Sequence, residues 1–230
     1  MTSIKEVTGI DYAIKFQCPA ALCLLGVSRS GKTAIIHRLL LERARLFETP
    51  PDEIIYVYEH WSPEMSALKA KITGIEFRQD IPSKAEFEDF SKDGFSRFLI
   101  IDDKAYSLKK NPDIEYISTV GSSHSSTSII LSSQIFFGGN TGELRTFLNN
   151  STAIILTRSR RATSQISELA RQIFGSAKKK FFLDAYRQAT SNKAYSYIVL
   201  DMSQRLDEKY QLRTQIFENE NCLVFTEKNT

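Results

Sequence analysis

Eight consecutive residues, from Gly26 to Thr33, read G-x-x-x-x-G-K-T. The glycines allow the backbone to curl so that successive N–H groups point at phosphate oxygens. In this spacing Lys32 reaches the β- and γ-phosphates of a nucleotide, and the Thr33 hydroxyl ligates magnesium. The residues expected to contact the nucleotide are Gly26, Val27, Ser28, Arg29, Ser30, Gly31, Lys32, Thr33 and Ala34. The spacing therefore predicts a loop that binds nucleotide phosphates together with Mg²⁺.

Two acidic residues end the apolar run at 97–103. Asp102 is expected to complete the shell of magnesium ligands, and Asp103 to orient or deprotonate an attacking water. Two acids after a strand also form an ordinary helix N-cap, and this reading stays open, above all for Asp103. Gln134 ends the apolar run at 127–134, on the sheet edge that faces a ligand crevice, where it can hold water beside the γ-phosphate. These residues favour hydrolysis of the nucleotide.

Arginines lie on both sides of the apolar run that begins at Thr152. Arg145 precedes this run, and Arg158, Arg160 and Arg161 come at its end. Phosphoryl transfer gains most from a positive charge delivered to the γ-phosphate, often by a neighbouring subunit. Surface arginines or contacts to DNA phosphates explain any single one of them equally well. The cluster as a whole favours a role at the nucleotide.

Alternating strand and helix patterns must position these residues. The expected strands are nearly continuous apolar runs, which is typical of parallel strands covered on both faces. They lie at 20–26, 53–59, 97–103, 127–134 and 152–158. Segments of helical period lie at 32–46, 63–71, 83–91, 112–122, 141–149 and 163–173. This alternation predicts an α/β fold of three layers with a mainly parallel central sheet.

The C-terminal part of the chain departs from this alternation. We expect a helix at 179–190, followed by strands at 194–201 and 210–217. The two strands are expected to pair as an antiparallel hairpin at the sheet edge. Residues 218–230 are polar and are expected to form a loose tail.

The chain has 230 residues, which suits one well-buried α/β domain. That domain is expected to span 1–217, with its core at about 20–175 and the C-terminal helix and hairpin at 178–217. A content of 42% hydrophobic and 25% charged residues is ordinary for a soluble protein. Three cysteines without a C-x-x-C pair argue against a zinc site or a disulfide framework.

No apolar run is long enough to span a membrane, and the first residues lack the apolar core of a signal peptide. We therefore expect an intracellular protein without a membrane partner. The formal net charge of +3 is too small to indicate nucleic acid by itself, although 157–161 and 178–180 are local basic clusters.

Three classes of phosphate-loop protein can be compared with these residues. A GTPase reads guanine with an [N/T]-K-x-D motif, and the segment at 192–195 reads NKAY, without the Asp. A small-molecule kinase has no need of a second acid after Asp102, and TRSRR at 157–161 makes a poor arginine-rich lid. An ATP-hydrolysing motor accounts for Asp103, Gln134 and the arginines together. The residues favour the motor.

Several segments together resemble the genome-packaging ATPases of the FtsK–HerA superfamily. The resemblance covers roughly residues 20–217. Within the superfamily, the chain resembles above all the small ATPases of Polinton/Maverick-type elements, adintovirus-like viruses and their poxvirus and virophage relatives. The segments are GVSRSGKT, YVYEHWSPEM, FLIIDDK, GSSHSSTSIILSSQIFFGG, LRTFLNNSTAIILTRSRRATSQISELARQIF and YSYIVLDMSQRLDEKYQLRTQIF. The resemblance implies a P-loop NTPase fold of the RecA/FtsK type with a C-terminal β-hairpin extension, and ATP with Mg²⁺ as its cofactors.

The resemblance also implies roles for individual residues. Asp102 is the Walker B acid, and Gln134 is the sensor glutamine after the fourth strand. Arg145 and Arg161 fall where the family places arginines, either of which could act in trans on a neighbour's nucleotide. Glu59 ends the second strand, where relatives also carry an acid that positions water or bonds the loop backbone.

The sequence departs from the family pattern in two places. Gln134 is followed by Ile135, where the family commonly has Asn. The segment after the fifth strand reads RSRRA, where relatives often read N-P-R-D, so either Arg160 or Arg161 is the positioned arginine. In addition, Asp103 stands where many motors use Glu. The shorter acid loses one methylene of reach and is expected to slow hydrolysis.

The resemblance implies an ATP-driven translocase that packages double-stranded DNA into a preformed capsid. Such motors form rings of five or six subunits at a capsid vertex, and they contact the DNA backbone without reading its sequence. Candidate pore loops are 103–112 and 136–143, although an ordinary surface loop explains each equally well. The protein is then expected at the viral assembly site, in the host nucleus or cytoplasm, or on the virion.

Two alternatives stay open. The first is a DNA-translocating ATPase or helicase that segregates or resolves DNA, which would look the same at the active site. The second is a nucleotide-dependent capsid-assembly switch that moves no DNA, and the small net charge gives this alternative some weight.

Overall fold

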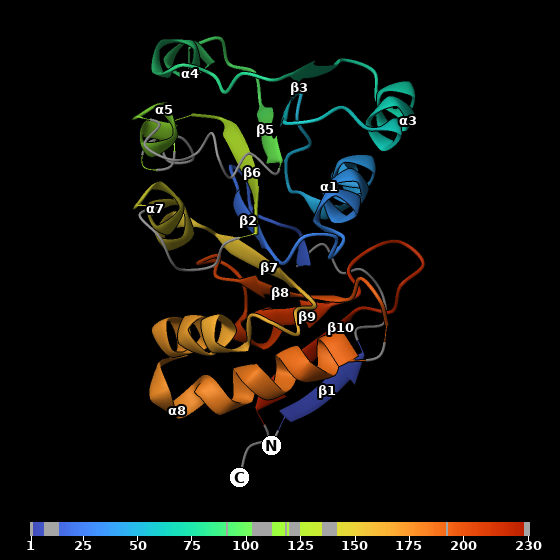
Figure 1. Cartoon of the computed structure of the whole chain (residues 1–230), viewed down its shortest axis with the longest axis vertical. Helices are drawn as coiled ribbons and strands as arrows, with labels where there is room; N and C mark the ends of the chain where they lie inside the picture. The colour runs from blue at the N-terminus through green and yellow to red at the C-terminus, as the bar shows by residue number, and fades with distance from the viewer. Residues whose placement is uncertain are drawn as a thin grey trace.

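In the computed structural model, a ten-stranded sheet carries helices on both faces (Figure 1). The structure describes residues 2–6, 14–90, 92–102, 112–117, 119, 125–134, 142–191 and 193–227. The strands are β1 (Thr2–Glu6), β2 (Ala21–Leu25), β3 (Glu53–Tyr58), β4 (Ile75–Arg78), β5 (Arg97–Asp102), β6 (Thr127–Ser133), β7 (Ala153–Thr157), β8 (Tyr197–Asp201), β9 (Leu212–Thr214) and β10 (Leu223–Glu227). Their order across the sheet is β1-β10-β9-β8-β7-β2-β6-β5-β3-β4.

The strands from β7 to β4 in this order are all paired in parallel. Five of them were expected from the sequence, and β4 was not. Parallel strands end at the same edge, so the carboxyl ends of β2, β3, β5 and β6 lie together, next to the start of α1. The expected α/β fold with a mainly parallel sheet is confirmed.

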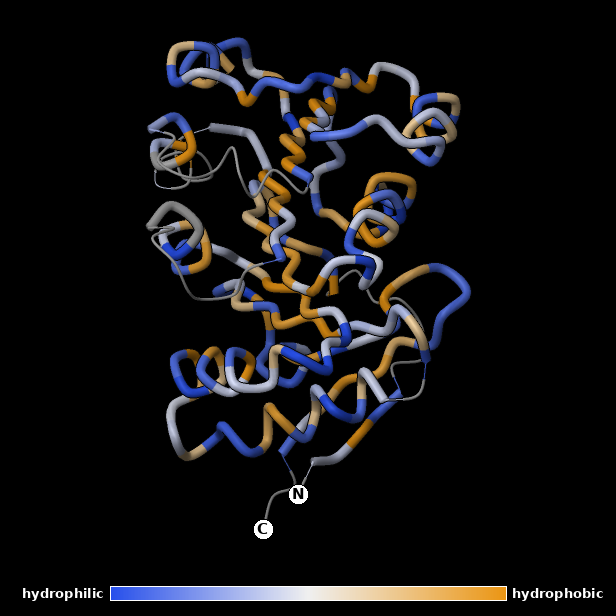
Figure 2. Tube along the Cα trace, viewed as in Figure 1, coloured by the Kyte–Doolittle hydropathy of each residue, from blue (hydrophilic) through white to orange (hydrophobic). Residues whose placement is uncertain are grey.

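Strand β2 explains why these strands read as unbroken apolar runs. All of its residues are buried. Ala21, Cys23 and Leu25 belong to the hydrophobic cluster on one face of the sheet, and Leu22 and Leu24 to the cluster on the other. Because alternate side chains enter two different cores, both must be apolar. Figure 2 shows hydrophobic residues concentrated along the central strands.

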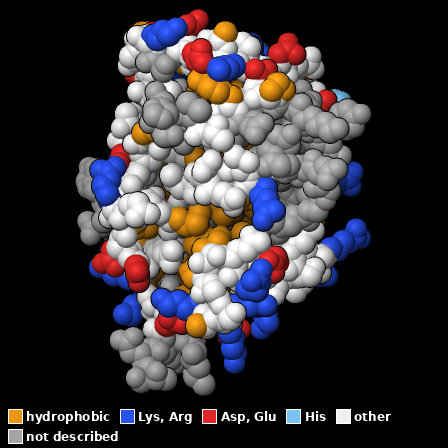
Figure 3. Space-filling view, turned by 90° about the vertical axis from the view of Figure 1, so that its left-hand side faces the viewer, with side chains coloured by type: hydrophobic (Ala, Val, Ile, Leu, Met, Phe, Trp, Pro, Cys, Tyr) orange, Lys and Arg blue, Asp and Glu red, His pale blue; other side chains and the backbone are white. Residues whose placement is uncertain are grey.

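The helices form two layers. Helices α1 and α3 cover one face of the sheet, and α4, α5, α7 and α8 lie on the other (Figure 1). Their bounds are α1 Lys32–Leu41, α2 Arg43–Leu46, α3 Pro63–Lys71, α4 Lys84–Phe90, α5 Pro112–Tyr116, α7 Gly142–Asn150 and α8 Thr163–Ser191, with a 3₁₀ turn at Glu208–Tyr210. On the face that carries α4, α5, α7 and α8, charged side chains lie around the rim and apolar ones towards the middle (Figure 3). No helix in the described part of the chain is long and apolar enough to cross a membrane.

One helix prediction needed adjustment, and the expected division of a second helical stretch into two helices is confirmed. The helix expected over 32–46 is divided at Glu42, whose φ of −102° and ψ of 18° are not helical, into α1 and α2. Helix α8 is broken at Gly175, whose φ is 67° and ψ is −179°. Its two halves correspond to the helices expected at 163–173 and 179–190.

Beyond β7 the sheet continues in antiparallel strands. β8 pairs with β7 and β9 pairs with β8, as the expected hairpin requires. The hairpin is not at the sheet edge, however, because β10 pairs with β9 and β1 pairs with β10. The prediction of a loose tail over 218–230 was therefore wrong for Leu223–Glu227. Val224 and Phe225 are buried there, and the burial depends on β1 from the other end of the chain.

Candidate nucleotide-binding site

The predicted phosphate loop connects β2 to α1. The Gly26 N–H donates to the Ser133 carbonyl at 3.2 Å, which ties the start of the loop to the end of β6. A Cβ at Gly26 would lie only 1.8 Å from Thr157 Oγ1, so no other residue fits without movement. The Thr157 hydroxyl donates to Ser30 Oγ at 2.7 Å. The loop is thus held from one side by β6 and from the other by β7.

The loop turns into the helix at Gly31, whose φ of 94° favours glycine. Arg29 also has a positive φ, of 59°, and it is exposed at the loop. The Lys32 side chain crosses the loop, and its Nζ donates to the carbonyls of Gly26 and Val27, both at 3.1 Å. Lys32 is only 6% exposed. An ammonium group, free helix N–H groups and a curled backbone together suit an anion.

Asp102 lies at the carboxyl end of β5 and is 4% exposed. Three hydroxyls from three different elements donate to its carboxylate. Thr33 Oγ1 in α1 donates to Oδ2 at 2.9 Å, Tyr56 in β3 donates to the same oxygen at 2.8 Å, and Ser132 in β6 donates to Oδ1 at 2.5 Å. The structure therefore brings together Thr33 and Asp102, the two residues predicted as metal ligands. A hydroxyl and a carboxylate oxygen are donors that suit Mg²⁺.

The surroundings of Tyr56 keep its hydroxyl protonated, so that it can donate to Asp102. Burial, followed by the charge of Asp102 and the hydrogen bond to it, raises the pKa of Tyr56 well above its usual value. His37 Nε2 lies 3.4 Å from the Tyr56 hydroxyl. Burial lowers the pKa of His37 below 6.5, against the opposing effects of Asp102 and Glu64. The imidazole is therefore neutral near pH 7 and brings no positive charge to this side of Asp102.

Gln134 and Glu59 both follow strands that end beside Asp102. Gln134 comes directly after β6 and is half-buried. Tyr58 is the cross-strand partner of Asp102, so Glu59 leaves β3 one residue beyond that pair. The Glu59 carbonyl accepts from Gln79 Nε2 at 3.5 Å. Both predicted residues thus lie at the edge of the sheet that carries the phosphate loop.

Some predicted residues cannot be placed. Asp103 lies outside the described residues, as does nearly all of each candidate pore loop, 103–112 and 136–143.

The predicted arginines lie in two places, on one helix and in one connecting segment. Arg145 is on α7, and Arg160 and Arg161 lie between β7 and α8; all three are exposed. None of the three forms an ion pair with a residue in the described ranges. Arg158 is half-buried, and its backbone N–H donates to the Ser196 carbonyl at 2.9 Å.

The segment that carries Arg160 and Arg161 is held by hydrogen bonds next to Thr157, the residue of β7 that contacts the phosphate loop. The Tyr186 hydroxyl donates to the Thr157 carbonyl at 3.2 Å and accepts from the Ser159 N–H at 2.9 Å. Ser159 Oγ in turn accepts from the N–H groups of Arg161 and Ala162. The backbone of this segment is therefore ordered while its guanidinium groups face outward.

Sequence reasoning missed the hydroxyl residues Tyr56, Ser132 and Thr157. Each lies inside a run that reads as a buried strand, so it was counted with the core. The available signal was polarity: Ser132 and Thr157 stand near the carboxyl ends of their strands, where a parallel sheet presents ligand-binding groups.

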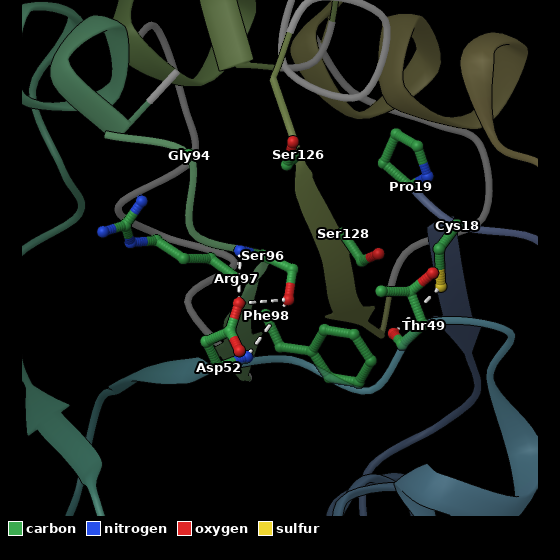
Figure 4. Close-up of a pocket in the computed structure, with 10 residues that line it drawn as sticks. All are labelled: Cys18, Pro19, Thr49, Asp52, Gly94, Ser96, Arg97, Phe98, Ser126 and Ser128. Carbon is green, nitrogen blue, oxygen red and sulfur yellow. Dashed lines mark hydrogen bonds between the residues drawn. The ribbon is translucent and has the colours of Figure 1, made fainter. Parts of the chain in front are cut away.

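A polar pocket of about 410 Å³ lies at the opposite edge of the sheet (Figure 4). It is lined by residues at or near the amino ends of β2, β3, β5 and β6, among them Cys18, Asp52 and Ser128. Asp52 accepts from both the N–H and the hydroxyl of Ser96 at 2.8 Å. Because β2 and β5 lead away from this pocket to the phosphate loop and Asp102, it is separate from the nucleotide site.

Comparison with solved structures supports this assignment of the fold. The genome packaging NTPase B204 from Sulfolobus turreted icosahedral virus 2, in complex with ATP-gammaS, matches with a TM-score of 0.52 and 18% identity over 80% of this chain and 93% of that one. The DNA-packaging ATPase B204 from Sulfolobus turreted icosahedral virus matches with a TM-score of 0.54 and 17% identity, with the same coverage. No protein-family model matches the sequence, and no curated protein does. The chain therefore has the fold of these viral packaging NTPases, which confirms the resemblance at the level of the fold.

Proposed function

We propose that this protein is an ATPase that moves double-stranded DNA into a preformed viral capsid. The observation that carries the proposal is the arrangement of Lys32, Thr33 and Asp102 at one edge of a packaging-NTPase fold. Lys32 lies across the loop, and the other two place a hydroxyl and a carboxylate 2.9 Å apart. This is the set of groups that nucleoside triphosphate binding requires.

Binding of ATP changes the partners of these groups. Phosphate oxygens replace the loop carbonyls of Gly26 and Val27 as acceptors for Lys32 Nζ. Thr33 and Asp102 are the residues that would hold Mg²⁺, which, when bound, neutralises charge on the β- and γ-phosphates. The hydroxyls of Tyr56 and Ser132 keep the Asp102 carboxylate oriented towards Thr33.

Hydrolysis further requires a water in line with the γ-phosphate. Asp103 or Glu59 is the proposed base, and Gln134 holds the water and reports the presence of the phosphate. Glu59 directly follows β3 and Gln134 directly follows β6, the two strands that pair with β5. These positions support this division of roles.

The exposed arginines support assembly into a ring. Arg145, Arg160 and Arg161 have no ion-pair partner in the described ranges, and a guanidinium delivered to a neighbour's γ-phosphate accelerates phosphoryl transfer. A closed ring of five or six copies at the capsid vertex gives every site such a neighbour. The pore then contacts DNA through its phosphates, independently of sequence.

The test is ATP hydrolysis with and without long double-stranded DNA, over a range of protein and salt concentrations. We expect stimulation by DNA that rises faster than linearly with protein and weakens with salt. Lys32→Ala should abolish turnover, whereas Lys92→Ala, which alters an exposed lysine paired with Asp89, should not change it.

Two other outcomes favour the alternatives. Turnover that ignores DNA and scales linearly with protein favours a nucleotide-dependent capsid-assembly switch, a reading that the net charge of +3 and the mixed charges in Figure 3 support. Turnover that DNA stimulates without any association with capsids favours a translocase that segregates or resolves DNA.

A further inference from the structure

Tyr195 lies directly against the phosphate loop, although it comes 163 residues after Lys32 in the sequence. A Cβ at Gly31 would lie 3.1 Å from Tyr195 Cδ1 and 3.2 Å from its Cβ. The ring therefore packs on the backbone of the residue directly before α1. Nothing in the apolar pattern of the sequence singled this tyrosine out.

Burial in the core does not explain why the ring lies here. Tyr195 is 66% exposed and belongs to neither hydrophobic cluster. Its hydroxyl forms no hydrogen bond with any residue in the described part of the chain. Exposed aromatic rings lose the free energy of burial, so a large ring held in solvent beside a loop suits a binding surface.

The backbone holds the ring in this place. Tyr195 has a φ of 59°, in the left-handed region that bulky residues rarely adopt. Its neighbours are fixed: Ser196 Oγ donates to the Lys193 carbonyl at 2.8 Å, and the Ser196 carbonyl accepts from the Arg158 N–H at 2.9 Å. Thr157 and Tyr197 are paired across β7 and β8. An uncommon conformation between such anchors persists only because its surroundings determine it.

The place of contact suggests the ligand. In a nucleoside triphosphate the ribose and base follow the α-phosphate, and the loop and the start of α1 are where backbone N–H groups would receive the phosphates. Gly31 is at that point, and Ala34, in the first turn, is exposed and small. A ring on Gly31 with a free face is therefore within reach of the base.

We propose that Tyr195 stacks on the base of the nucleoside triphosphate whose phosphates the loop binds. This inference rests on the proposed nucleotide binding, but not on DNA or the capsid. Every base has a π-face, so stacking tolerates different bases. Tyr195 occupies the last position of NKAY, where a guanine-reading motif has Asp, and a phenol offers no carboxylate to guanine. ATP and GTP should therefore bind with similar affinity.

The test measures the dissociation constants of Mg-ATP and of inorganic tripolyphosphate by calorimetry. Tyr195→Leu should weaken ATP binding about 10-fold, since one stacked base contributes that order of affinity, and leave tripolyphosphate within about twofold. Tyr195→Phe should bind ATP as the unaltered protein does. Phe95→Leu removes another exposed aromatic ring, at the opposite sheet edge, and serves as the matched control.

A second readout does not depend on affinity. In Trp61→Phe, which removes the only tryptophan, Tyr195→Trp adds a fluorophore at the site. ATP should quench its fluorescence and tripolyphosphate should not.

Three results bear against the proposal or its premise, and they differ from one another. Equal loss of ATP and tripolyphosphate in Tyr195→Leu means that the ring only shapes the loop. Full ATP affinity in Tyr195→Leu overturns stacking outright. Failure of the unaltered protein to bind either ligand overturns the proposed nucleotide binding itself, whereas tight ATP binding without DNA stimulation leaves the role of Tyr195 standing.

Discussion

The two kinds of charged group that the proposed hydrolysis needs are held in opposite ways. Asp102 is buried and receives hydrogen bonds from three hydroxyls of the same chain. Arg145, Arg160 and Arg161 are exposed, and none has an ion-pair partner in the described ranges. In the proposed function, the half of the site that would hold Mg²⁺ lies within one chain, and the arginines face outward. This difference is what a site shared between neighbouring subunits requires.

A substitution that replaces one oxygen of the Asp102 side chain should disable the buried half of the proposed site. In Asp102→Asn the carboxylate is replaced by an amide of the same shape, which is a poor ligand for Mg²⁺ and brings no negative charge. Hydrolysis should fall by at least about 1000-fold because charge neutralisation on the phosphates is lost.

The readout is steady-state release of phosphate, with thermal unfolding as a check that the fold is intact. Asp89→Asn, which removes the partner of Lys92 at an exposed position, is the control and should keep full activity. Activity above a tenth of normal in Asp102→Asn would contradict the assigned role.

The antiparallel strands beyond β7 contain a second buried carboxylate, which is paired with a buried arginine. Asp201 and Arg213 form an ion pair of 2.6 Å with side chains 0% and 1% exposed. Asp201→Ala should lower the free energy of unfolding by about 3–5 kcal/mol, because the guanidinium is left buried without its partner. Asp207→Ala breaks the exposed pair with Lys209 and should lower the stability far less.

Denaturant unfolding of the two variants measures this contrast. Equal and small losses would show that the extension contributes little to the stability of the domain.

Tyr56 sharpens the account of Asp102. Tyr56→Phe removes one of its three donors and keeps the ring. The apparent affinity for Mg²⁺ should fall about 10-fold, as happens when groups that orient a metal ligand are removed, while turnover at saturating Mg²⁺ changes little.

Tyr58→Phe is the matched control, because Tyr58 lies two residues further along β3 and packs with Trp61 and Phe77. A fall in turnover that excess Mg²⁺ does not restore would assign Tyr56 a different role.

The smallest effect concerns His37. Its pKa is lowered in the folded protein, so below pH 6.5 the unfolded chain binds the proton more readily. The stability that neutral His37 contributes is present above pH 6.5 and is lost as the pH falls towards the lower pKa of the folded state.

Between about pH 7.5 and 5.5 the unfolding midpoint should therefore decline more in the unaltered protein than in His37→Asn. Parallel declines would mean that the imidazole is not held neutral.

The sequence predicts the parallel half of the molecule well because its signals are local. The five central strands are apolar runs whose neighbours in the sheet have the same composition, and the loop motif predicts the roles of Lys32 and Thr33. By contrast, β4 has only four residues, and both β4 and β10 mix buried with partly or fully exposed positions. Each is recognisable only through its partner, and the partner of β10 is at the other end of the chain.

The residues of the proposed site were predicted less completely than the fold. Tyr56 and Ser132 were hidden in apolar strands, since a hydroxyl in such a run looks like a tolerated core residue until its acceptor is known. Tyr195 follows no motif, and its place depends on the pairing of β7 with β8. Contacts between residues distant in sequence decide all three.

The most direct test of a shared site mixes two inactive variants. Lys32→Ala disables the loop but keeps the arginines, and Arg161→Ala does the reverse; Arg145→Ala and Arg160→Ala are tested in the same way. For the arginine that acts in trans, the account predicts hydrolysis reduced about 1000-fold in the single variant and substantially restored in the mixture, where some loops meet an intact neighbour. If no arginine variant loses activity, or if no mixture recovers it, the site is completed within one chain and the central claim is wrong.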